Sequence, residues 1–147
     1  MIDVETILER LDALQEYVDK LRPMQSLTPE DMQDENRYVE YWAVQRGLEL
    51  ATQCVLDISS HLVAGLRLGH PQEYRQAILL LGQHKVLPSE FAEHLSQIAG
   101  FRNIIVHDYL DIDPILVHRA VTIGLDDLET FAEQIIIYLR QEGYLAD

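Results

Sequence analysis

The chain has 147 residues and a formal net charge of −14 at pH 7, from 25 acidic and 11 basic side chains. This length allows one domain with a sizeable hydrophobic core, and we expect residues 1–147 to form a single domain. The charge argues against broad, nonspecific binding to nucleic acid, because affinity for phosphates needs clustered cations. It still permits an enzyme with a local positive patch, and it suits a protein that binds a basic partner.

The single cysteine, Cys54, excludes a disulfide framework and a cysteine-rich zinc site. A chain of this kind is typical of a reducing compartment, so we expect a cytoplasmic protein. The acidic N-terminus leads directly into an amphipathic pattern, unlike a signal peptide, and no apolar run approaches the roughly 20 residues that span a bilayer. We therefore expect a soluble protein that does not enter the membrane.

Apolar residues recur at helical spacing along most of the chain. The first stripe predicts a helix over about residues 3–21, which Pro23 ends. The segment Thr28–Asp31 is typical of a helix start, with an N-cap residue, a first-turn proline and first-turn acids. From there, or after a break near Asp34, we expect a long second helix that Gly65 ends.

Three further helices are predicted, over about residues 72–84, from Ser89 into the segment 102–109, and from Asp113 to just before Gly143. Asp113 and the proline that follows it are typical of an N-cap and a first helical turn. Because the connections are short, the sequence predicts an all-α, antiparallel up-and-down bundle of about five helices. We expect Trp42, on the second helix, to lie in the core or at a dimer interface.

An arginine interrupts the apolar stripe of the predicted fourth helix. The stripe runs at steps of three and four through Phe91, Leu95, Ile98, Arg102, Ile105 and Tyr109. A guanidinium is almost never left buried and unpaired, so Arg102 needs a carboxylate, a phosphate or a water-filled cleft. An ion pair with Glu49 or Asp57 would explain its position as well as a functional role would.

A second face of this helix carries Asn103 and His107 together with Gly100 and Ser96, whose small side chains would let another backbone or a substrate approach closely. Arg102 and His107 are about 140° apart around an ideal helix and about 7.5 Å apart along it. One straight helix therefore does not aim both at one point. A helix end near His107, a long reach of the arginine or a two-fold dimer would bring them together, and we favour the dimer.

The spacing Arg102-x4-His107-x-Tyr109 resembles the R-x4-H-x-Y signature of HEPN-domain proteins, specifically the HepT toxins of MntA–HepT systems. The resemblance extends over essentially the whole chain and includes the stretches 55–61 and 99–103. It implies a HEPN-like helical homodimer that acts as the toxin of a type VII toxin–antitoxin system. The implied activity is metal-independent cleavage of RNA, with tRNA as the expected substrate and mRNA as the alternative, and neither a metal nor another cofactor is expected.

The residue types fit this chemistry. RNA carries its own nucleophile, the 2′-hydroxyl, so cleavage needs a proton acceptor, a proton donor and stabilisation of the phosphorane charge. His107 would serve as general base or acid, and Arg102 would supply a fixed cation with two donors for the phosphate. Asn103 would orient His107 or hold a phosphate oxygen. Hydrolysis at a chain end is an alternative that these residues do not decide.

Tyr109 has two functional interpretations beside that of an ordinary core tyrosine. Its ring would stack on a base, or its hydroxyl would bind the scissile phosphate. Resemblance to HepT also implies that this hydroxyl receives AMP from a cognate MntA-like nucleotidyltransferase, the antitoxin, which would block the cleft with bulk and negative charge. The chain lacks the motifs of a nucleotidyltransferase, so it would be the target of that enzyme.

A second class of function is a non-catalytic helical dimer that binds a nucleotide or a protein. Arg102 and His107 would then grip a nucleotide or pair across the dimer interface, while the acidic surface would dock a basic partner. The two classes differ in whether RNA is cut.

Overall fold

A computed structural model of the protein describes residues 1–108 and 110–147, so Tyr109 lies outside the described residues. The eight α-helices of this part of the chain are α1 (Val4–Leu21), α2 (Pro29–Gln33), α3 (Tyr38–Gly65), α4 (Tyr74–Gln83), α5 (Ser89–Leu95), α6 (Ile98–His107), α7 (Pro114–Thr122) and α8 (Gly124–Gln141). Two 3-10 turns, η1 (Arg22–Ser26) and η2 (Glu35–Arg37), flank α2. The described residues contain no β-strand.

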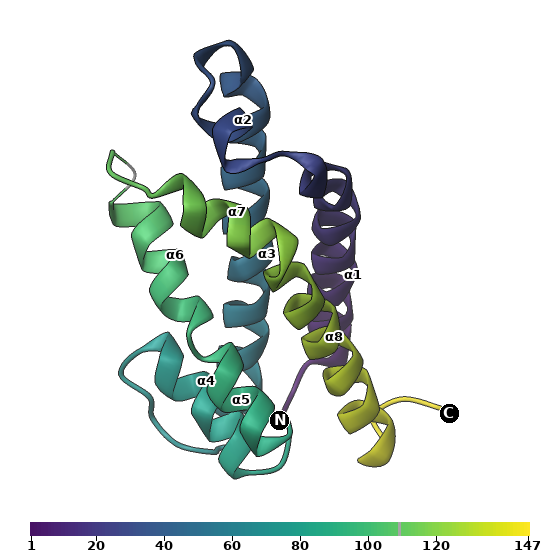
Figure 1. Cartoon of the computed structure of the whole chain (residues 1–147). Helices are drawn as coiled ribbons and strands as arrows, with labels where there is room; N and C mark the ends of the chain where they lie inside the picture. Colours follow the sequence, from purple (N-terminus) through teal and green to yellow (C-terminus); the bar gives the residue numbers. More distant parts are fainter. Residues whose placement is uncertain (109) are drawn as a thin grey trace.

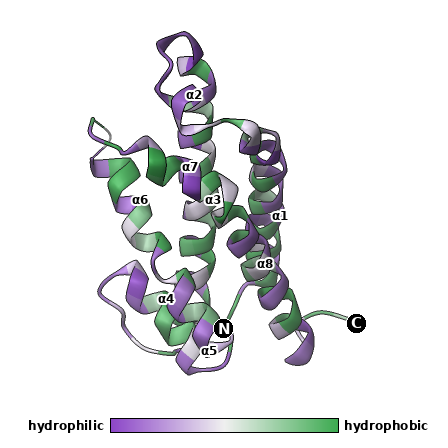
Figure 2. Ribbon diagram, in the orientation of Figure 1, coloured by the Kyte–Doolittle hydropathy of each residue, from purple (hydrophilic) through white to green (hydrophobic). Residues whose placement is uncertain are grey.

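The long helix α3 forms the centre of the bundle (Figure 1). Helices α1 and α8 pack along one side of α3, α4 and α6 pack along the other, α5 packs on α4, and α7 crosses α3. The helices turn their apolar faces toward one another (Figure 2), and the largest fully buried side chains include Leu14, Leu48, Leu56, Ile58, Phe131 and Ile135. The predicted all-α bundle is confirmed.

Local capping chemistry sets several helix starts where the sequence predicts them. Thr28 Oγ1 accepts a hydrogen bond from the Asp31 N–H (3.1 Å), and the Asp31 carboxylate accepts one from the Thr28 N–H (2.9 Å). This reciprocal capping box satisfies two backbone donors that the first helical turn leaves free. Asp113 caps α7 by accepting from the Ile115 N–H at 2.9 Å. Of the two alternatives for the long helix, the structure has the one with a break at Asp34.

Two of the five predicted helices are each divided into two. The predicted fourth helix breaks into α5 and α6 at Ser96, whose buried hydroxyl donates to the Glu93 carbonyl at 2.6 Å. The predicted fifth helix breaks into α7 and α8 at Ile123, directly after Thr122, whose hydroxyl donates to the His118 carbonyl at 2.8 Å. Such bonds from side chain to backbone compete with a regular helix. The apolar periodicity continues across both breaks and therefore does not reveal them.

The prediction that Trp42 lies in the core is wrong. Its side chain is 63% exposed, and its ring meets the ring of Tyr38, which is 51% exposed, edge to face with centroids 4.9 Å apart. Val39 between them is exposed as well. The first turns of α3 thus present an apolar patch to solvent, which we call the α3 patch (Tyr38, Val39 and Trp42). A place at a dimer interface stays a prediction.

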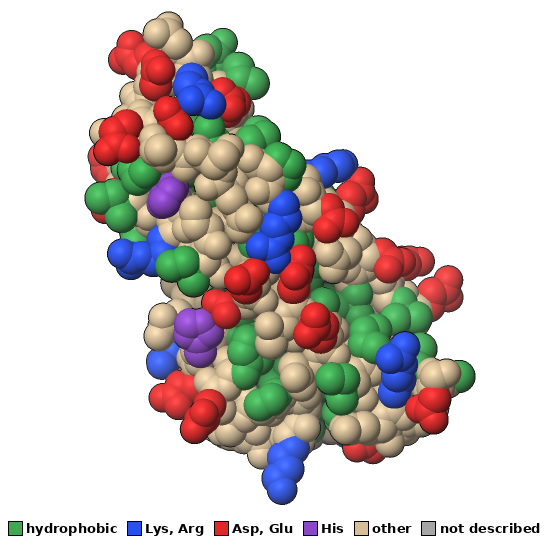
Figure 3. Space-filling model, turned by 45° about the vertical axis from the view of Figure 1, so that its right-hand side comes forward, with side chains coloured by type: hydrophobic (Ala, Val, Ile, Leu, Met, Phe, Trp, Pro, Cys, Tyr) green, Lys and Arg blue, Asp and Glu red, His purple; other side chains and the backbone are tan. Residues whose placement is uncertain are grey.

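Acidic side chains are distributed over the face of the molecule that Figure 3 shows. In Figure 3 they are spread over the whole visible face, and the basic side chains lie singly between them. Within the described part of the chain, every helix is too short or too polar to cross a membrane.

Candidate active site

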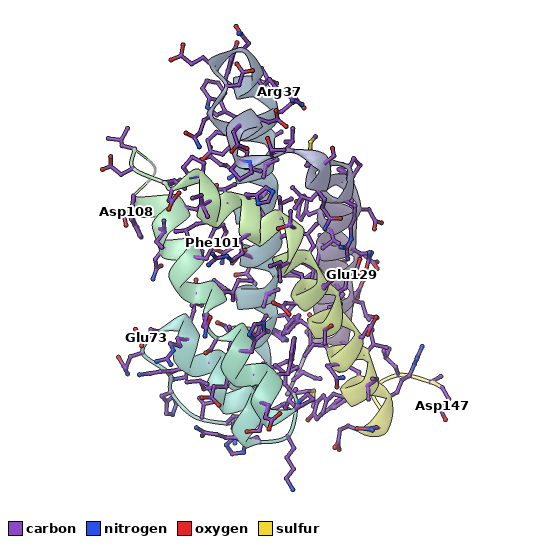
Figure 4. All side chains as sticks on the ribbon, in the orientation of Figure 1. Arg37, Glu73, Phe101, Asp108, Glu129 and Asp147 are labelled. Atoms are coloured by element: carbon purple, nitrogen blue, oxygen red, sulfur yellow. The ribbon has the colours of Figure 1, made fainter. Side chains whose placement is uncertain are left out.

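Helix α6 carries three of the four predicted site residues, while Tyr109 follows the helix and is not described. Only two of its ten residues, Ala99 and Ile105, are buried against the bundle. Phe101 lies between α6 and the neighbouring helices α3 and α7 (Figure 4), where it packs partly buried against the core. This packing turns one side of α6 to the bundle and the other to solvent.

Arg102 is half-buried, and residues from three helices surround its guanidinium. Its Nε donates to Oε1 of Gln53 on α3 at 3.4 Å. The guanidinium carbon lies 5.7 Å from the ring centroid of Tyr74, the first residue of α4, within the range of a cation–π contact. A long contact of 3.5 Å joins Nη1 to Oδ1 of the adjacent Asn103. The three partners are uncharged, so they position the Arg102 guanidinium without neutralising its charge.

The structure contains neither of the two ion pairs that the sequence suggested for Arg102. Glu49 instead contacts Arg46 at 3.3 Å, and Asp57 lies 3.8 Å from Arg10. Among the described residues, no carboxylate oxygen lies within 4.0 Å of the Arg102 guanidinium. The charge of Arg102 is therefore held in place but is not neutralised by a nearby acid.

Asn103 and His107 are exposed on the solvent side of α6, where Gly100 is exposed too. A Cβ atom added at Gly100 would meet no atom within 4 Å, so this part of the face is open to a ligand or a second chain. Ser96 does not belong to the face, contrary to expectation, because the helix breaks there and its side chain is fully buried. Because the helix is interrupted at Ser96 and Gln97, the spacing of four residues does not place Ser96 on the same side as Gly100.

One subunit does not bring Arg102 and His107 together. Arg102 turns toward Gln53 and Tyr74, whereas His107, the last residue of α6, is exposed. No hydrogen bond within the described part of the chain joins the two side chains. The angular separation expected from an ideal helix thus persists in the structure.

A groove with a volume of about 550 Å³ opens next to this cluster. Helix α6 forms one wall with Ala99, Gly100 and Asn103, and the segment 71–77 forms the other. Ser60 of α3 lies between them. We call this the α4–α6 groove.

Sequence reasoning missed Gln53 and Tyr74. Gln53 lies four residues before Asp57 on α3, and its Nε2 donates to Asp57 Oδ1 at 2.8 Å, so a polar pair at helical spacing was visible in the sequence. Nothing in the sequence near Tyr74 links it to Arg102, because their contact depends on how α4 packs against α6.

Metal ligands and the single thiol are two further kinds of chemical group to locate in the described residues. The described residues contain no group of three or more His, Cys, Asp and Glu side chains placed to hold a metal ion. Burial, and then the Asp57 carboxylate, raise the pKa of the Cys54 thiol above its ordinary value. Cys54 therefore stays protonated at neutral pH, which disfavours a role as nucleophile.

Two relatives match the sequence over much of its length. The chain is 29% identical over 141 residues to the tRNA nuclease HepT of Aphanizomenon flos-aquae, which covers 95% of each chain. It is 32% identical over 88 residues to the mRNA nuclease HepT of Shewanella oneidensis, which covers 60% of this chain and 66% of that protein. The names of these relatives specify different classes of RNA.

Solved structures share the fold. The YutE protein from Bacillus subtilis, described as a cytosolic protein of unknown function, matches with a TM-score of 0.83 at 23% identity and covers 99% of this chain and 96% of its own. A tri-AMPylated Shewanella oneidensis HEPN toxin in complex with MNT antitoxin matches with a TM-score of 0.78 at 23% identity, covering 93% of this chain and 99% of its own. At these identities the likeness shows a common HEPN-type helical bundle.

The family assignment depends on the sequence itself. The model of the family described as Ribonuclease HepT-like matches residues 7–135, which include the whole of α6 and both residues that hold Arg102. The chain therefore belongs to the HepT-like ribonucleases.

Proposed function

We propose that residues 1–147 form one domain that acts as the toxin of a type VII toxin–antitoxin system, a metal-independent ribonuclease with Arg102 and His107 as catalytic residues. The observation that carries this proposal is the setting of Arg102, which Gln53 and Tyr74 position while no described carboxylate lies within 4.0 Å. A guanidinium in this setting keeps its charge and its paired donors available for a phosphate.

The proposed reaction starts with the 2′-hydroxyl of the substrate. His107 accepts its proton, the 2′-oxygen attacks the adjacent phosphorus, and the bond to the 5′-oxygen breaks when that oxygen takes a proton from a water molecule. Arg102 stabilises the negative charge that builds up on the phosphorane oxygens. The Asn103 amide, on the same exposed face as His107, donates to a phosphate oxygen. Because the nucleophile belongs to RNA, this scheme requires no metal-bound water.

The active unit in this proposal is a homodimer. A two-fold axis near the end of α6 would place His107 of the partner subunit opposite Arg102, which a single subunit does not achieve. The exposed α3 patch supports an interface at this end of the molecule, since the first turns of α3 and the C-terminal end of α6 both lie in the upper half of Figure 1. Exposed apolar patches of this kind are typical of interaction surfaces.

We assign tRNA as the first substrate to test. The relative that aligns with 95% of this chain is named a tRNA nuclease, whereas the relative named an mRNA nuclease aligns with 60%.

The proposed antitoxin is an MntA-like nucleotidyltransferase that modifies Tyr109. The tyrosine hydroxyl would attack the α-phosphorus of ATP, form a phosphodiester with AMP and release pyrophosphate. Tyr109 follows His107 by two residues, so the added negative charge would lie next to the motif. The fold shared with a tri-AMPylated HEPN toxin supports this modification.

The decisive experiment combines induction of the protein in cells with sequencing of RNA ends. The wild type is expected to arrest growth and to cut RNA at defined positions, and the purified protein should keep this activity in EDTA. His107→Ala should fold and be harmless, and Arg102→Lys should lose most activity because lysine lacks the planar pair of donors. A wild type that leaves RNA intact and growth unchanged would refute the enzyme proposal and favour the non-catalytic binding module.

The proposed modification has its own test. Co-expression with the nucleotidyltransferase should add AMP to the peptide that contains Tyr109, detected by mass spectrometry, and should suppress toxicity. Tyr109→Phe should retain toxicity in the presence of the antitoxin, provided that it cuts RNA alone. AMP on another residue would contradict the assignment to Tyr109.

A further inference from the structure

Tyr74 lies between two grooves on one side of the molecule. The first is the α4–α6 groove, with a volume of about 550 Å³. The second has a volume of about 300 Å³ and is lined by Thr6 and Arg10 of α1 and by Asp57 and His61 of α3. Tyr74 and Ser60 line both grooves, so the two form neighbouring compartments on either side of the tyrosine. Each compartment has the size of a small-molecule site.

Each groove has an arginine in its wall, and a third arginine lies beside the tyrosine that the grooves share. Arg75 lines the first groove, Arg10 lines the second, and Arg102 lies over the Tyr74 ring. The carboxylates in these walls are Asp57, which contacts Gln53 and Arg10, and Glu73, which Figure 4 shows on the outer side of the loop before α4. The lining itself carries two arginines and two acids, and Arg102 over the Tyr74 ring adds one further cation, in a chain whose net charge is −14.

The geometry points to a track for single-stranded RNA. We infer that Tyr74 stacks on the base of one unpaired nucleotide with the ring face that Arg102 does not cover, while Arg75 and Arg10 contact the phosphates of the strand. Aromatic side chains beside cations are the usual way of holding a single strand without regard to its sequence. The bases of a duplex are already stacked on each other, so a duplex would not offer them to Tyr74.

This inference rests on the proposed function, because it supplies the path by which substrate reaches the motif. Asn103 lines the α4–α6 groove and precedes His107 by four residues on the same helix face, about 6 Å along its axis. A strand that leaves the groove over Asn103 therefore runs directly to His107. Tyr74 acts as a binding and positioning residue for RNA in this arrangement.

The test uses a fluorescein-labelled single-stranded oligonucleotide whose 2′-oxygens are methylated, so that it binds but is not cut. Its affinity for the full-length protein is measured by fluorescence anisotropy. Loss of one stacked base corresponds to about a 5- to 100-fold loss of affinity, which is the effect expected for Tyr74→Ala. Tyr74→Phe keeps the aromatic face and should bind within about twofold of the wild type.

Two further variants probe the grooves without touching the core. A Cβ at Gly100 meets nothing within 4 Å, so Gly100→Leu should fold while its side chain fills the α4–α6 groove and weakens binding by about tenfold or more. Gly100→Ala is the matched small variant and should bind normally. Arg75→Ala should weaken binding and lower the dependence of affinity on salt by about one counterion.

A third groove, with a volume of about 570 Å³, provides matched controls. It contains Lys85 and Tyr138, one cation and one tyrosine, at the other end of α4. Lys85→Ala and Tyr138→Ala should bind the oligonucleotide as the wild type does. Equal losses in these controls would mean nonspecific binding and would overturn the track.

The remaining outcomes separate the two proposals. The track is overturned if the wild type does not bind the oligonucleotide, if it binds the matching duplex as tightly, or if Tyr74→Ala and Gly100→Leu bind normally. If Tyr74 proves necessary for binding but unmodified RNA is never cut, the track stands and the ribonuclease proposal fails. If RNA is cut while the Tyr74 and Gly100 variants bind and cut normally, the ribonuclease stands and the track fails.

Discussion

Gln53 connects Arg102 to Asp57 through the two ends of one amide. Its Oε1 accepts from Arg102 Nε at 3.4 Å, and its Nε2 donates to Asp57 Oδ1 at 2.8 Å. The bond to Asp57 fixes which end of the amide faces the arginine, since only the oxygen can accept from a guanidinium. An acid thus contributes to the orientation of Arg102 without direct contact, and the cation keeps its charge for a substrate.

Gln53→Glu should damage RNA cleavage more than Gln53→Ala. A carboxylate at this position would form a charge-assisted bond to Arg102 and compete with the phosphate, whereas alanine only removes a positioning contact. We expect kcat/KM to fall on the order of tenfold or more for Gln53→Glu, measured from initial rates on the RNA identified in cells. Gln83→Glu, at the far end of α4, adds the same charge away from Arg102 and should leave the rate unchanged. Equal activity of Gln53→Glu and wild type would exclude this role.

Ser59 and Ser96 form a matched pair for stability. Both side chains are fully buried, but no described residue offers a hydrogen-bond partner to the Ser59 hydroxyl, whereas the Ser96 hydroxyl donates to the Glu93 carbonyl at 2.6 Å. A buried hydroxyl without a partner is unfavourable, so Ser59→Ala should raise the free energy of unfolding by up to about 1 kcal/mol. Ser96→Ala should lower it by about 1 kcal/mol. Urea unfolding measures the free energy of unfolding of both variants. If both lose the same amount of stability, the Ser59 hydroxyl also has a hydrogen-bond partner.

Replacing two helical glycines by alanine should change the free energy of unfolding in opposite directions. A Cβ at Gly82 would lie 2.6 Å from the Cβ of Ala92, so α4 and α5 would have to move apart. We expect Gly82→Ala to cost about 1–3 kcal/mol of unfolding free energy, as overpacked cores do. Gly100→Ala meets open space and should stabilise the fold by up to about 1 kcal/mol through its better helix propensity. Thermal melts in which Gly82→Ala is neutral would contradict the close packing of these helices.

The corner between α2 and α3 should weaken in acid. Arg37 contacts Asp31 at 3.0 Å and Glu40 at 2.9 Å. The pKa of Asp31 is lowered first by its hydrogen bond from the Thr28 backbone, and the pKa of Glu40 is lowered first by its hydrogen bond from Arg37. A carboxyl with a lowered pKa in the folded state stabilises the fold above its ordinary pKa, and this contribution is lost as the pH falls through the lowered value.

The melting temperature should therefore fall modestly below about pH 4, where these carboxyls begin to bind protons. Glu40→Gln should show a smaller fall than the wild type, because it removes one of the titrating partners of Arg37. Glu35→Gln, in the same corner but outside these ion pairs, is the control and should follow the wild type. If the melting temperature depended on pH in the same way in all three proteins, the protonation of Glu40 would not contribute to the loss of stability in acid.

Helix starts were predictable because their chemistry is local. Thr28 and Asp113 each cap a helix through a backbone donor two or three residues away, so the sequence alone contains the interaction. The breaks at Ser96 and Ile123 were missed because the apolar repeat continues through them while the backbone does not. The two alternatives for Trp42 could not be separated for a related reason, since an aromatic residue at an apolar position does not reveal whether its own chain or another one covers it; the structure excludes the core.

The candidate site was predictable only in part. Arg102, Asn103 and His107 are close in sequence, so their motif is visible, but the groups that hold Arg102 come from other helices. Gln53 lies 49 residues earlier in the chain, and a search for the partner of a cation favours acids over amides. The contact with Tyr74 depends on where α4 begins, which only the packed structure determines.

The small buried surface of α6 has a consequence for how the protein responds to its own concentration. Ten residues of α3 are buried, but only Ala99 and Ile105 of α6 are, and a turn or loop bounds α6 at each end. Such a segment opens locally at lower free energy than the central helix, and amide exchange should be faster there. In the proposed dimer, the second subunit would supply the missing contacts. The fraction of molecules with an ordered α6 would therefore rise with the protein concentration. Below the dissociation constant the motif helix would fluctuate and cut little RNA, which would give the proposed toxin an expression threshold even without an antitoxin.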